Sequence, residues 1–320
     1  MYKKYDIAAL GEILIDFTEN GESESGMRLF EQNPGGAVAN VLCAISKLGK
    51  KASFIGKVGD DMHGAFLRET LENMGVDTCG MVTDKDFFTT LAFVSLSKSG
   101  ERSFSFARKP GADTRLAISD VNKSILHNTT VFHVGSLSMT DEPARSATIY
   151  AIKEAKKAGA VISYDPNYRA SLWVSKEQAI EQMRSILPLI DIIKISDEET
   201  GLIADKKQPE EAASELIKLG ISCVAVTLGK DGALICTKDG VKRVPAFTGK
   251  VVDTTGAGDS FWGAFLYRLI DSGMRPSELK LAVAADFARF GNAAAAICIG
   301  RRGAIPALPG LEEVEKLLSS

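Results

Sequence analysis

The chain has 320 residues, enough for about two average domains or for one large α/β unit with an appendage. Hydrophobic residues make up 45% and charged residues 25%, which excludes a disordered, a collagen-like or a membrane-spanning protein. The 38 basic and 41 acidic side chains nearly cancel, and a net charge of -3 without a dense basic block excludes a dedicated nucleic-acid binder.

Cysteine usage and the N-terminus favour a cytoplasmic protein. The five cysteines are odd in number, far apart and never in a C-x-x-C pair, so they indicate neither a disulfide framework nor a zinc site. The apolar run after Lys3 and Lys4 is interrupted by Asp6 and Glu12, too early for a signal peptide. The longest apolar run, Ala293 to Ile299, is too short to span a bilayer. We therefore expect neither a membrane nor a nucleic acid as partner.

Strands and helices alternate along most of the chain. Short buried strands are predicted at 6–10, 52–58, 131–134, 161–164, 192–195 and 223–227. Helices are predicted at 36–48, 62–74, 142–158, 175–187, 209–219, 259–272 and 276–299. Because this alternation is typical of a parallel sheet, we expect an α/β fold with a central, mainly parallel sheet flanked by helices.

Two segments, at about 13–33 and 78–110, do not follow this pattern. They contain alternating runs such as 91–96 and 103–106, joined by a turn signal at 98–101. Inserted between units of a parallel sheet, such hairpin strands most simply form a small antiparallel flap at one edge. We expect this small β-sheet to act as a lid, and an exposed strand in it to offer an edge for a homodimer.

The most specific local signal is D-T-T-G-A-G-D at Asp253 to Asp259, a glycine-rich turn that opens a predicted helix. Gly256 and Gly258 allow backbone conformations closed to other residues, so successive amides can converge at the positive end of that helix and form an anion hole. Asp259 directly after it suits an acid that accepts the proton of a hydroxyl attacking a bound phosphoryl group. The alternative is that Asp259 only caps or decorates the first helical turn.

A second glycine turn, at 33–40, also opens a predicted helix. Gly35 and Gly36 would let a polar ligand approach the backbone. Asn40, one turn into the helix, offers both a donor and an acceptor to a polyol. The alternative is an ordinary junction between a loop and a helix.

Together the two motifs resemble the signatures of the ribokinase-like carbohydrate kinases, the PfkB family. An early G-G-x-x-x-N element is followed about 220 residues later by a D-T-x-G-A-G-D element, and the resemblance covers nearly the whole chain. It implies a single ribokinase-like α/β domain over residues 1–320 that transfers the γ-phosphoryl group of MgATP to a monosaccharide hydroxyl. ATP and Mg²⁺ are the implied cofactors, and many members also bind K⁺.

The resemblance also implies a role for individual positions. The catalytic base matches Asp259, and the amides that neutralise the transferring phosphate match Gly256, Ala257 and Gly258. The positions that hold sugar hydroxyls match Asp16, Gly35, Gly36 and Asn40. The nucleotide-binding positions match Thr227, Gly229, Gly232 and Asn292. The potassium positions match Asp253, Thr255 and Gly303.

One element departs from the family pattern. Where the family usually has N-x-x-E, this sequence reads Ser196-Asp-Glu-Glu199. Glu199 keeps the acid that helps to organise magnesium and its waters, and the Ser196 hydroxyl can act through water. We therefore expect the metal site to include Glu199 and the reaction to depend on magnesium.

The segments that bear on substrate choice, 106–113, 133–138 and 163–173, resemble the fructokinase branch of the family. The expected acceptor is therefore D-fructose and the expected product fructose 6-phosphate. 2-Keto-3-deoxygluconate kinases share a similar D-x-N-x-R stretch, and ribose or a nucleoside are further alternatives. Arg108 and Arg169 are expected to reach a substrate hydroxyl or phosphate, the alternative for each being a surface ion pair.

Two interpretations lie outside the kinase class. A non-catalytic sugar or nucleotide sensor could share the scaffold, although the intact run from Gly256 to Asp259 disfavours it. A dinucleotide-dependent oxidoreductase would fit the alternating strands and helices. This sequence lacks the G-x-G-x-x-G fingerprint of such enzymes, because Phe261 stands where the third glycine is required.

Overall fold

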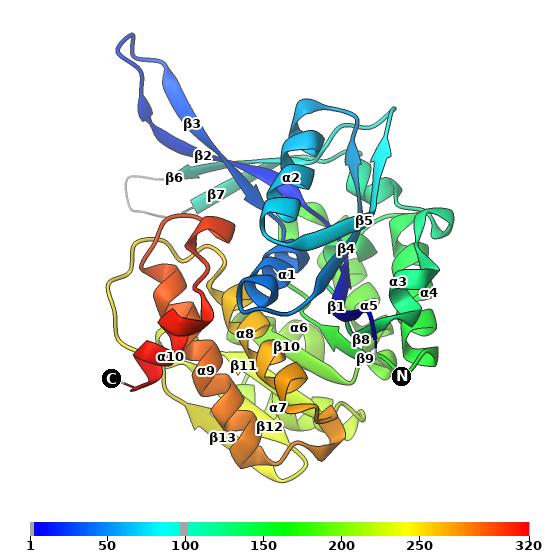
Figure 1. The fold of residues 1–320 in the computed structure, drawn as a ribbon, viewed down its shortest axis with the longest axis vertical. Coiled ribbons are helices and arrows are strands. Elements are labelled where there is room, and N and C mark those ends of the chain that lie inside the picture. Colours follow the sequence, from blue (N-terminus) through cyan, green and yellow to red (C-terminus); the bar gives the residue numbers. More distant parts are fainter. Residues whose placement is uncertain (1–2, 97–101, 320) are drawn as a thin grey trace.

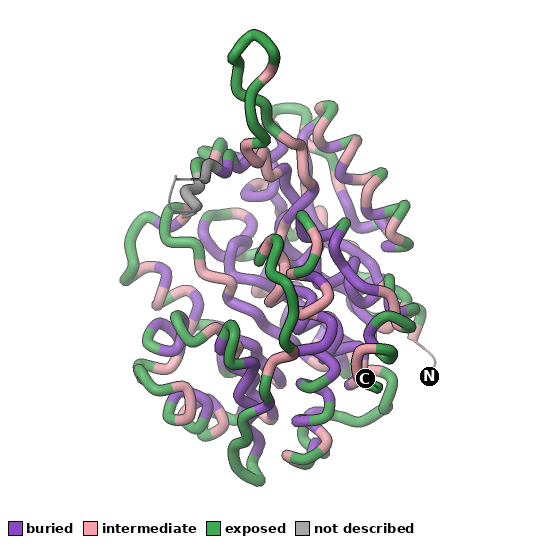
Figure 2. Tube along the Cα trace, turned by 90° about the vertical axis from the view of Figure 1, so that its left-hand side faces the viewer, coloured by how far each residue is buried: buried purple, intermediate pink, exposed green. Residues whose placement is uncertain are grey.

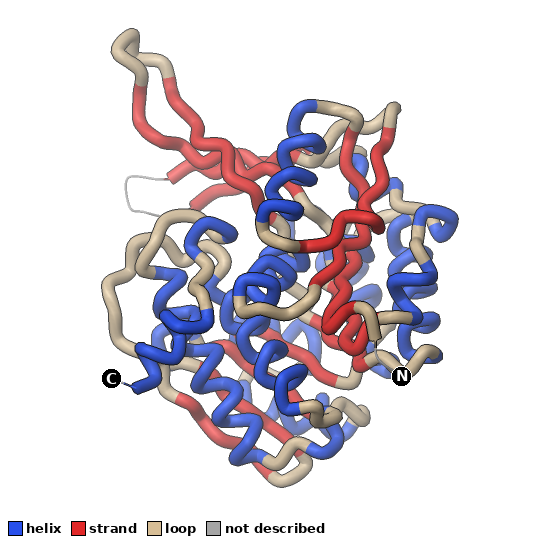
Figure 3. Tube along the Cα trace, in the orientation of Figure 1, coloured by secondary structure: helices blue, strands red, loops and turns tan. Residues whose placement is uncertain are grey.

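A computed structural model describes residues 3–96 and 102–319, so the predicted turn at 98–101 lies outside the described residues. The described chain forms a nine-stranded sheet with helices on both faces and a four-stranded sheet beside it (Figures 1 and 3). The predicted α/β fold, with a central sheet flanked by helices and a small second sheet, is thereby confirmed.

The large sheet is mainly parallel. Its strand order is β13-β12-β11-β10-β9-β8-β1-β4-β5, and β12 is the strand that runs antiparallel to its neighbours. The strands are β1 (Tyr5–Leu10), β4 (Ala52–Gly59), β5 (Val76–Asp84), β8 (Thr129–Val134), β9 (Val161–Tyr164), β10 (Ile192–Ser196), β11 (Cys223–Thr227), β12 (Ala233–Thr237) and β13 (Gly240–Val244). The chain runs outward from β1 to β4 and β5 and then returns to the other side of β1 at β8. In open α/β sheets, ligands bind outside the carboxyl ends of the strands at such a reversal.

Helices cover both faces because successive side chains of a strand point to opposite sides. One buried apolar cluster joins the sheet to α3, α4, α5, α6 and α7, and a second joins it to α1, α2, α8 and α9. The helices are α1 (Ala37–Lys47), α2 (Met62–Asn73), α3 (Lys123–His127), α4 (Ala144–Lys157), α5 (Lys176–Ser185), α6 (Thr200–Ala204), α7 (Pro209–Lys218), α8 (Ala257–Ser272), α9 (Leu281–Ile299) and α10 (Leu311–Ser319). Figure 2 shows the buried residues in these central layers and the exposed residues in the outer turns and a projecting hairpin.

The small sheet has the order β3-β2-β6-β7. It is mixed, and the prediction of an antiparallel sheet is wrong in this respect, because its two antiparallel hairpins join through β2 and β6, which run parallel. Its strands are β2 (Leu14–Glu22), β3 (Arg28–Gly35), β6 (Leu91–Leu96) and β7 (Arg102–Ala107). The β2–β3 hairpin projects from the body of the molecule (Figure 1). Because β2 begins shortly after β1 and β3 leads into α1, this sheet starts at the carboxyl end of β1, beside the expected ligand crevice.

Several elements of the structure differ from the predicted ones. Residues 78–84, predicted in the flap, belong to β5 and pair with β4 in the large sheet. β5 lies at the sheet edge, so its buried and exposed residues alternate as in a hairpin strand. The hairpin of β12 and β13 was not predicted. The predicted helix 276–299 is a short turn at Pro276–Glu278 followed by α9, because the extended Lys280 separates them.

Among the described residues, α9 is the helix long and apolar enough to cross a membrane by length and composition alone. In the structure 56% of its most apolar window is buried inside the protein, and its apolar side chains join the same buried cluster as those of α8. These contacts are those of a core helix.

Candidate active site

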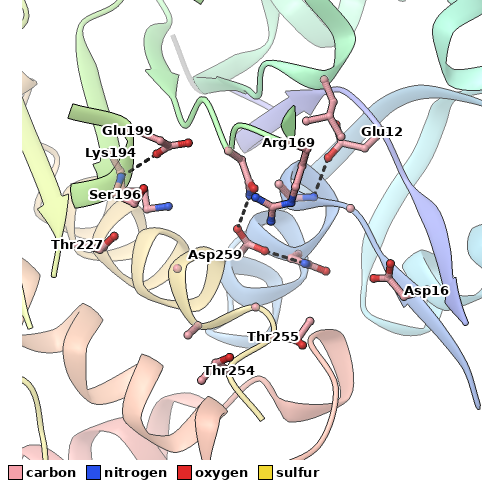
Figure 4. A pocket seen from close by; sticks show the side chains of 18 of the residues that line it. Glu12, Asp16, Arg169, Lys194, Ser196, Glu199, Thr227, Thr254, Thr255 and Asp259 are labelled. Carbon is pink, nitrogen blue, oxygen red and sulfur yellow. Dashed lines mark hydrogen bonds between the residues drawn. The ribbon is translucent and has the colours of Figure 1, made fainter. Parts of the chain in front are cut away.

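A cavity of about 370 Å³ opens at the carboxyl ends of the strands of the large sheet (Figure 4). Residues at or just after the ends of β1, β8, β9, β10 and β11 line it, namely Glu12, Leu137, Asn167, Ser196 and Thr227. The start of β2, the start of α1 and the first turn of α8 complete its wall. The cavity therefore lies at the reversal of strand order and joins segments that are far apart in the sequence.

The first turn of α8 presents its backbone to this cavity. Gly256 has a left-handed conformation with a φ of 75°, and a Cβ there would lie 2.8 Å from the Cβ of Ala304. Gly256, Ala257 and Gly258 line the cavity, and no side chain of the described chain caps this helix start. Because α8 is 16 residues long, the positive end of its dipole faces the cavity. This geometry suits an anion, and the role of the three residues in phosphoryl transfer stays a prediction.

Asp259 lies on the cavity wall although its side chain is buried, at 7% exposed. Its Oδ2 accepts a hydrogen bond of 2.8 Å from Asn40 Nδ2, and its Oδ1 accepts one of 3.3 Å from Asn167 Nδ2. Burial, and then the charge of Asp165, raise the pKa of Asp259 to about 6, against the lowering effects of Lys194 and Asn40. The carboxyl group is thus held in one orientation and is more basic than an ordinary aspartate.

Three of the four predicted sugar positions line the same cavity, and one of them, Asn40, contacts Asp259. Asp16, Gly36 and Asn40 line it, whereas Gly35 lies behind Asp16, whose carboxyl group would collide with a Cβ on Gly35. Gly36 has a φ of 118°, and a Cβ there would lie 2.6 Å from the Glu12 carbonyl oxygen. The two glycines therefore allow the β3–α1 junction to pack closely against β1 and β2.

The two candidate arginines have different surroundings. Arg169 lines the cavity, is exposed, and donates to the carbonyl oxygen of Tyr168 at 3.1 Å. Arg108 is 4% exposed and does not line this cavity. Its guanidinium group donates to Asp113 at 2.7 Å, to Thr140 and to the carbonyl oxygen of Leu137. The expectation that Arg108 contacts the substrate is corrected, because its donors are committed to an interior ion pair.

The predicted nucleotide residues are spread along β11, the turn after it and α9. Thr227 lines the cavity, and Gly229 and Gly232 adopt positive φ values of 55° and 90° in the turn between β11 and β12. Asn292 does not line the cavity. Its Nδ2 donates to the carbonyl oxygens of Val244 and Pro245 at 3.0 Å each, so it holds the segment after β13.

The predicted metal residues form two groups. Glu199 accepts amide hydrogen bonds on both carboxyl oxygens, from Tyr168 at 2.7 Å and from Ser196 at 2.8 Å. Asp253 accepts from the Thr255 amide at 2.8 Å and from the Gly303 amide at 3.0 Å, beside a small cavity of about 20 Å³. The described residues contain no group of three or more His, Cys, Asp or Glu side chains that could enclose a metal ion.

Comparison with known proteins places this site in a family. A sequence model described as pfkB family carbohydrate kinase matches residues 4–310. The chain belongs to the PfkB family of carbohydrate kinases. Its kinase membership argues against the dinucleotide-dependent oxidoreductase interpretation.

Proteins similar to this PfkB kinase in sequence or in structure have similar lengths. The chain is 45% identical over 318 residues to a protein named probable fructokinase-5 from Arabidopsis thaliana, covering 98% of this chain and 97% of that protein. A crystal structure of a fructokinase from Xylella fastidiosa with bound ATP has a TM-score of 0.89 at 31% identity, covering 98% of each chain. A fructokinase variant from Vibrio cholerae with fructose, ADP and a potassium ion has a TM-score of 0.88 at 31% identity, covering 99% of this chain and 100% of that one.

Three site residues of this PfkB kinase were not assigned from the sequence. Glu12 is 2% exposed, accepts from the Ala37 amide at 2.8 Å, and burial raises its pKa to about 7. Asn167 lies in the D-P-N-x-R stretch, which indicated substrate choice but not a contact with the predicted base. Lys194 stands in the apolar run of β10, where a charged residue is itself unusual. That interruption was the one sequence signal that could have identified it.

Proposed function

We propose that this PfkB kinase transfers the γ-phosphoryl group of ATP to the 6-hydroxyl of D-fructose and releases ADP and fructose 6-phosphate. The observation that carries the proposal is a carboxyl group, Asp259, fixed by two amide donors beside the bare helix start at Gly256 to Gly258 in one cavity. Relatives named fructokinase, at 41–45% identity over almost the whole chain, support fructose as the acceptor.

The proposed reaction needs a base for the sugar hydroxyl and a cradle for the phosphoryl charge. The sugar 6-oxygen forms a bond to the γ-phosphorus while its proton passes to Asp259. The bond from the γ-phosphorus to the oxygen shared with the β-phosphate breaks, and ADP leaves. With a pKa of about 6, Asp259 is mostly ionised at pH 7 and still basic enough to take this proton. The 256–258 amides stabilise the charge that develops on the phosphoryl oxygens.

The donor set suits a magnesium ion that arrives with ATP. The Ser196 hydroxyl and the carboxyl groups of Glu198 and Glu199 line the cavity, and no dedicated carboxylate cage lies among the described residues. Mg²⁺ is characteristically held by substrate phosphates, water and one or two carboxylates. When bound, it would neutralise phosphate charge, and Glu199, already fixed by two backbone amides, would orient its waters.

Potassium is the second proposed ion. Asp253, Thr255 and Gly303 are among the residues that line a small cavity adjoining the start of α8, and the Gly303 amide holds the Asp253 carboxyl group there. An ion bound there would stabilise the conformation of the neighbouring anion-binding turn at Gly256 to Gly258. Comparing turnover in potassium and in a bulky monovalent cation, at equal ionic strength, checks this proposal, and equal rates would contradict it.

We also propose that the small sheet closes over the sugar. Asp16 on β2 and Phe106 on β7 line the cavity, so movement of this sheet would exclude water that otherwise receives the phosphoryl group. The edge strand β3 exposes Leu29 and Phe30 at 46% and 41%, which supports a homodimer through the lid. Light scattering at assay concentration tests the dimer, and a monomer would contradict it. Five free cysteines, four of them buried, support the cytoplasm as the location.

A panel of acceptors assayed at fixed MgATP tests the substrate. We expect ADP release with D-fructose to exceed that with 2-keto-3-deoxygluconate, ribose or a nucleoside by kcat/KM. A higher kcat/KM for one of the others would replace fructose as the acceptor. ADP release with none of them, together with tight sugar binding, would favour the sensor interpretation instead.

A further inference from the structure

Lys194 is a buried lysine that the proposed reaction does not yet use. Its side chain is 7% exposed, rises from β10 and lines the cavity. Nζ donates to Oδ2 of Asp165, itself 1% exposed, at 2.9 Å. Burying such a pair costs several kcal/mol of desolvation per ion, and an apolar pair would often be at least as stable. The ion pair is therefore weak evidence for a purely structural purpose.

The cavity is lined by more acidic than cationic side chains, and this imbalance suggests a role for Lys194. The acidic residues that line it are Glu12, Asp16, Glu198, Glu199 and Asp259. Arg169 and Lys194 are the cationic residues that line it, and Arg169 is exposed on its rim. Nζ of Lys194 forms an ion pair with the buried carboxyl group of Asp165 at 2.9 Å, and Glu199 and Asp259 are further acids near it. Of the two cationic residues that line the cavity, Lys194 is therefore the buried one, and its charge can offset that of a bound triphosphate.

The direction of the side chain points to one part of that triphosphate. Nζ of Lys194 lies 3.0 Å from the position that a Cβ on Gly258 would take. The ammonium group therefore stands against the same helical turn whose amides form the predicted anion hole. Asp165 is the hydrogen-bond partner of Nζ within the described residues, which leaves two of its three N–H groups for a ligand. Gly258 keeps this approach open, because any side chain there would meet the ammonium.

We propose that Lys194, anchored by Asp165, donates hydrogen bonds to the transferring γ-phosphoryl group of ATP. The amides of Gly256 to Gly258 bind this group from the helix, and the ammonium binds it from the sheet. Lys194 keeps its proton throughout. The bond to the sugar oxygen forms, the bond to the ADP oxygen breaks, and the hydroxyl proton goes to Asp259. The contact strengthens as negative charge spreads over the phosphoryl oxygens, so it favours the transition state.

Nucleotide binding separates this role from a structural one. In Lys194→Met, calorimetry with magnesium should show binding of a non-hydrolysable ATP analogue weakened about tenfold or more, with ADP affinity changed less than about twofold. kcat should fall about 100-fold with little change in the KM for fructose. Lys194→Arg keeps a positive charge and should therefore recover part of the difference in affinity between the ATP analogue and ADP. Equal weakening of both nucleotides, or of neither, would overturn the proposal.

A double variant guards against misfolding. Lys194→Met alone leaves the Asp165 carboxylate buried and unpaired, whereas Lys194→Met with Asp165→Asn leaves a neutral site. The double variant should unfold near the wild-type temperature and still fail to distinguish the analogue from ADP. If it folds and distinguishes them as the wild type does, Lys194 does not touch the γ-phosphoryl group. This inference rests on the proposed kinase activity. The two can fail separately: a wild type that phosphorylates no sugar would refute the activity, whereas the role of Lys194 is tested by nucleotide binding.

Discussion

Replacing Asp259 with asparagine is expected to lower activity and raise stability at the same time. Asparagine has the same shape but cannot accept the proton of the sugar hydroxyl. A general base contributes roughly 10²- to 10⁴-fold in rate, so kcat should fall at least about 100-fold, or about 2.7 kcal/mol of activation free energy. The affinity for ADP should stay near the wild-type value, because in the proposed reaction the carboxyl group acts on the sugar hydroxyl and not on the nucleotide.

The gain in stability follows from the pKa of Asp259, which burial chiefly raises from an ordinary 3.8 to about 6. Such a group supports folding below the unfolded-state pKa and loses that support as the pH rises through the folded-state pKa. The shift corresponds to about 3 kcal/mol of cost at pH 7. The neutral asparagine avoids this cost, but its amide nitrogen faces either Asn40 or Asn167, which removes about 1 kcal/mol of the gain. The free energy of unfolding should therefore rise by about 2 kcal/mol at pH 7 and by little below pH 4.

Two measurements check this prediction. ADP release as a function of pH should show wild-type kcat/KM falling below about pH 6, and urea unfolding at pH 7 and pH 4 should show the change in stability. Asp86→Asn, at an exposed acid outside the cavity, is the matched control and should change neither quantity. Near-wild-type turnover in Asp259→Asn would refute the assignment of the base. Unchanged stability at pH 7 would refute the argument that burial raises the pKa.

Three further substitutions probe the site and its support. Gly256→Ala forces a Cβ into a left-handed position, so the melting temperature should fall by a few degrees and kcat by about tenfold or more. Asn40→Ala removes a hydrogen bond that lowers the pKa of Asp259, so the acidic limb of the pH–rate profile should move to higher pH; an unmoved limb would contradict this. Arg108→Met leaves Asp113 buried without its ion pair and should cost about 3–5 kcal/mol in urea unfolding, and an unchanged midpoint would refute the interior role.

The parts of the fold that the sequence predicted are those set by local patterns. β9 and β11 have the bounds that their buried apolar runs indicated, and α8 begins within two residues of its predicted start. The misassigned residues 78–84 show where local patterns are insufficient. Alternating burial is shared by an edge strand of the large sheet and by a hairpin of the small one, and only the pairing with β4 distinguishes them.

The site residues also fall into two groups, those that a local sequence pattern identified and those that only the fold brings together. Gly256, Gly258 and Asp259 lie within four consecutive residues, so a single turn sets their geometry and the sequence was enough to group them. Asn167 contacts Asp259 across 92 positions in the chain. No local pattern encodes such a contact, because it depends on which strands become neighbours. Arg108 shows the opposite error. It was expected to reach the substrate, but Asp113, five residues later, holds it inside.

Burial on both faces explains why the polar residues of the cavity come from so many segments. Residues in the middle of these parallel strands lie under helices on either side, where a short polar side chain would lose its water without gaining a partner. Polar groups are therefore displaced to the carboxyl ends, and the strand-order reversal at β1 brings those ends around one cavity. Two exceptions differ in kind. His133 and Ser163 lie inside β8 and β9 but partner each other, with His133 Nδ1 3.0 Å from Ser163 Oγ. The other exception is Lys194. It starts in the middle of β10, but its long aliphatic chain carries the ammonium up to the level of Asp165 and Gly258, which no shorter cation could reach.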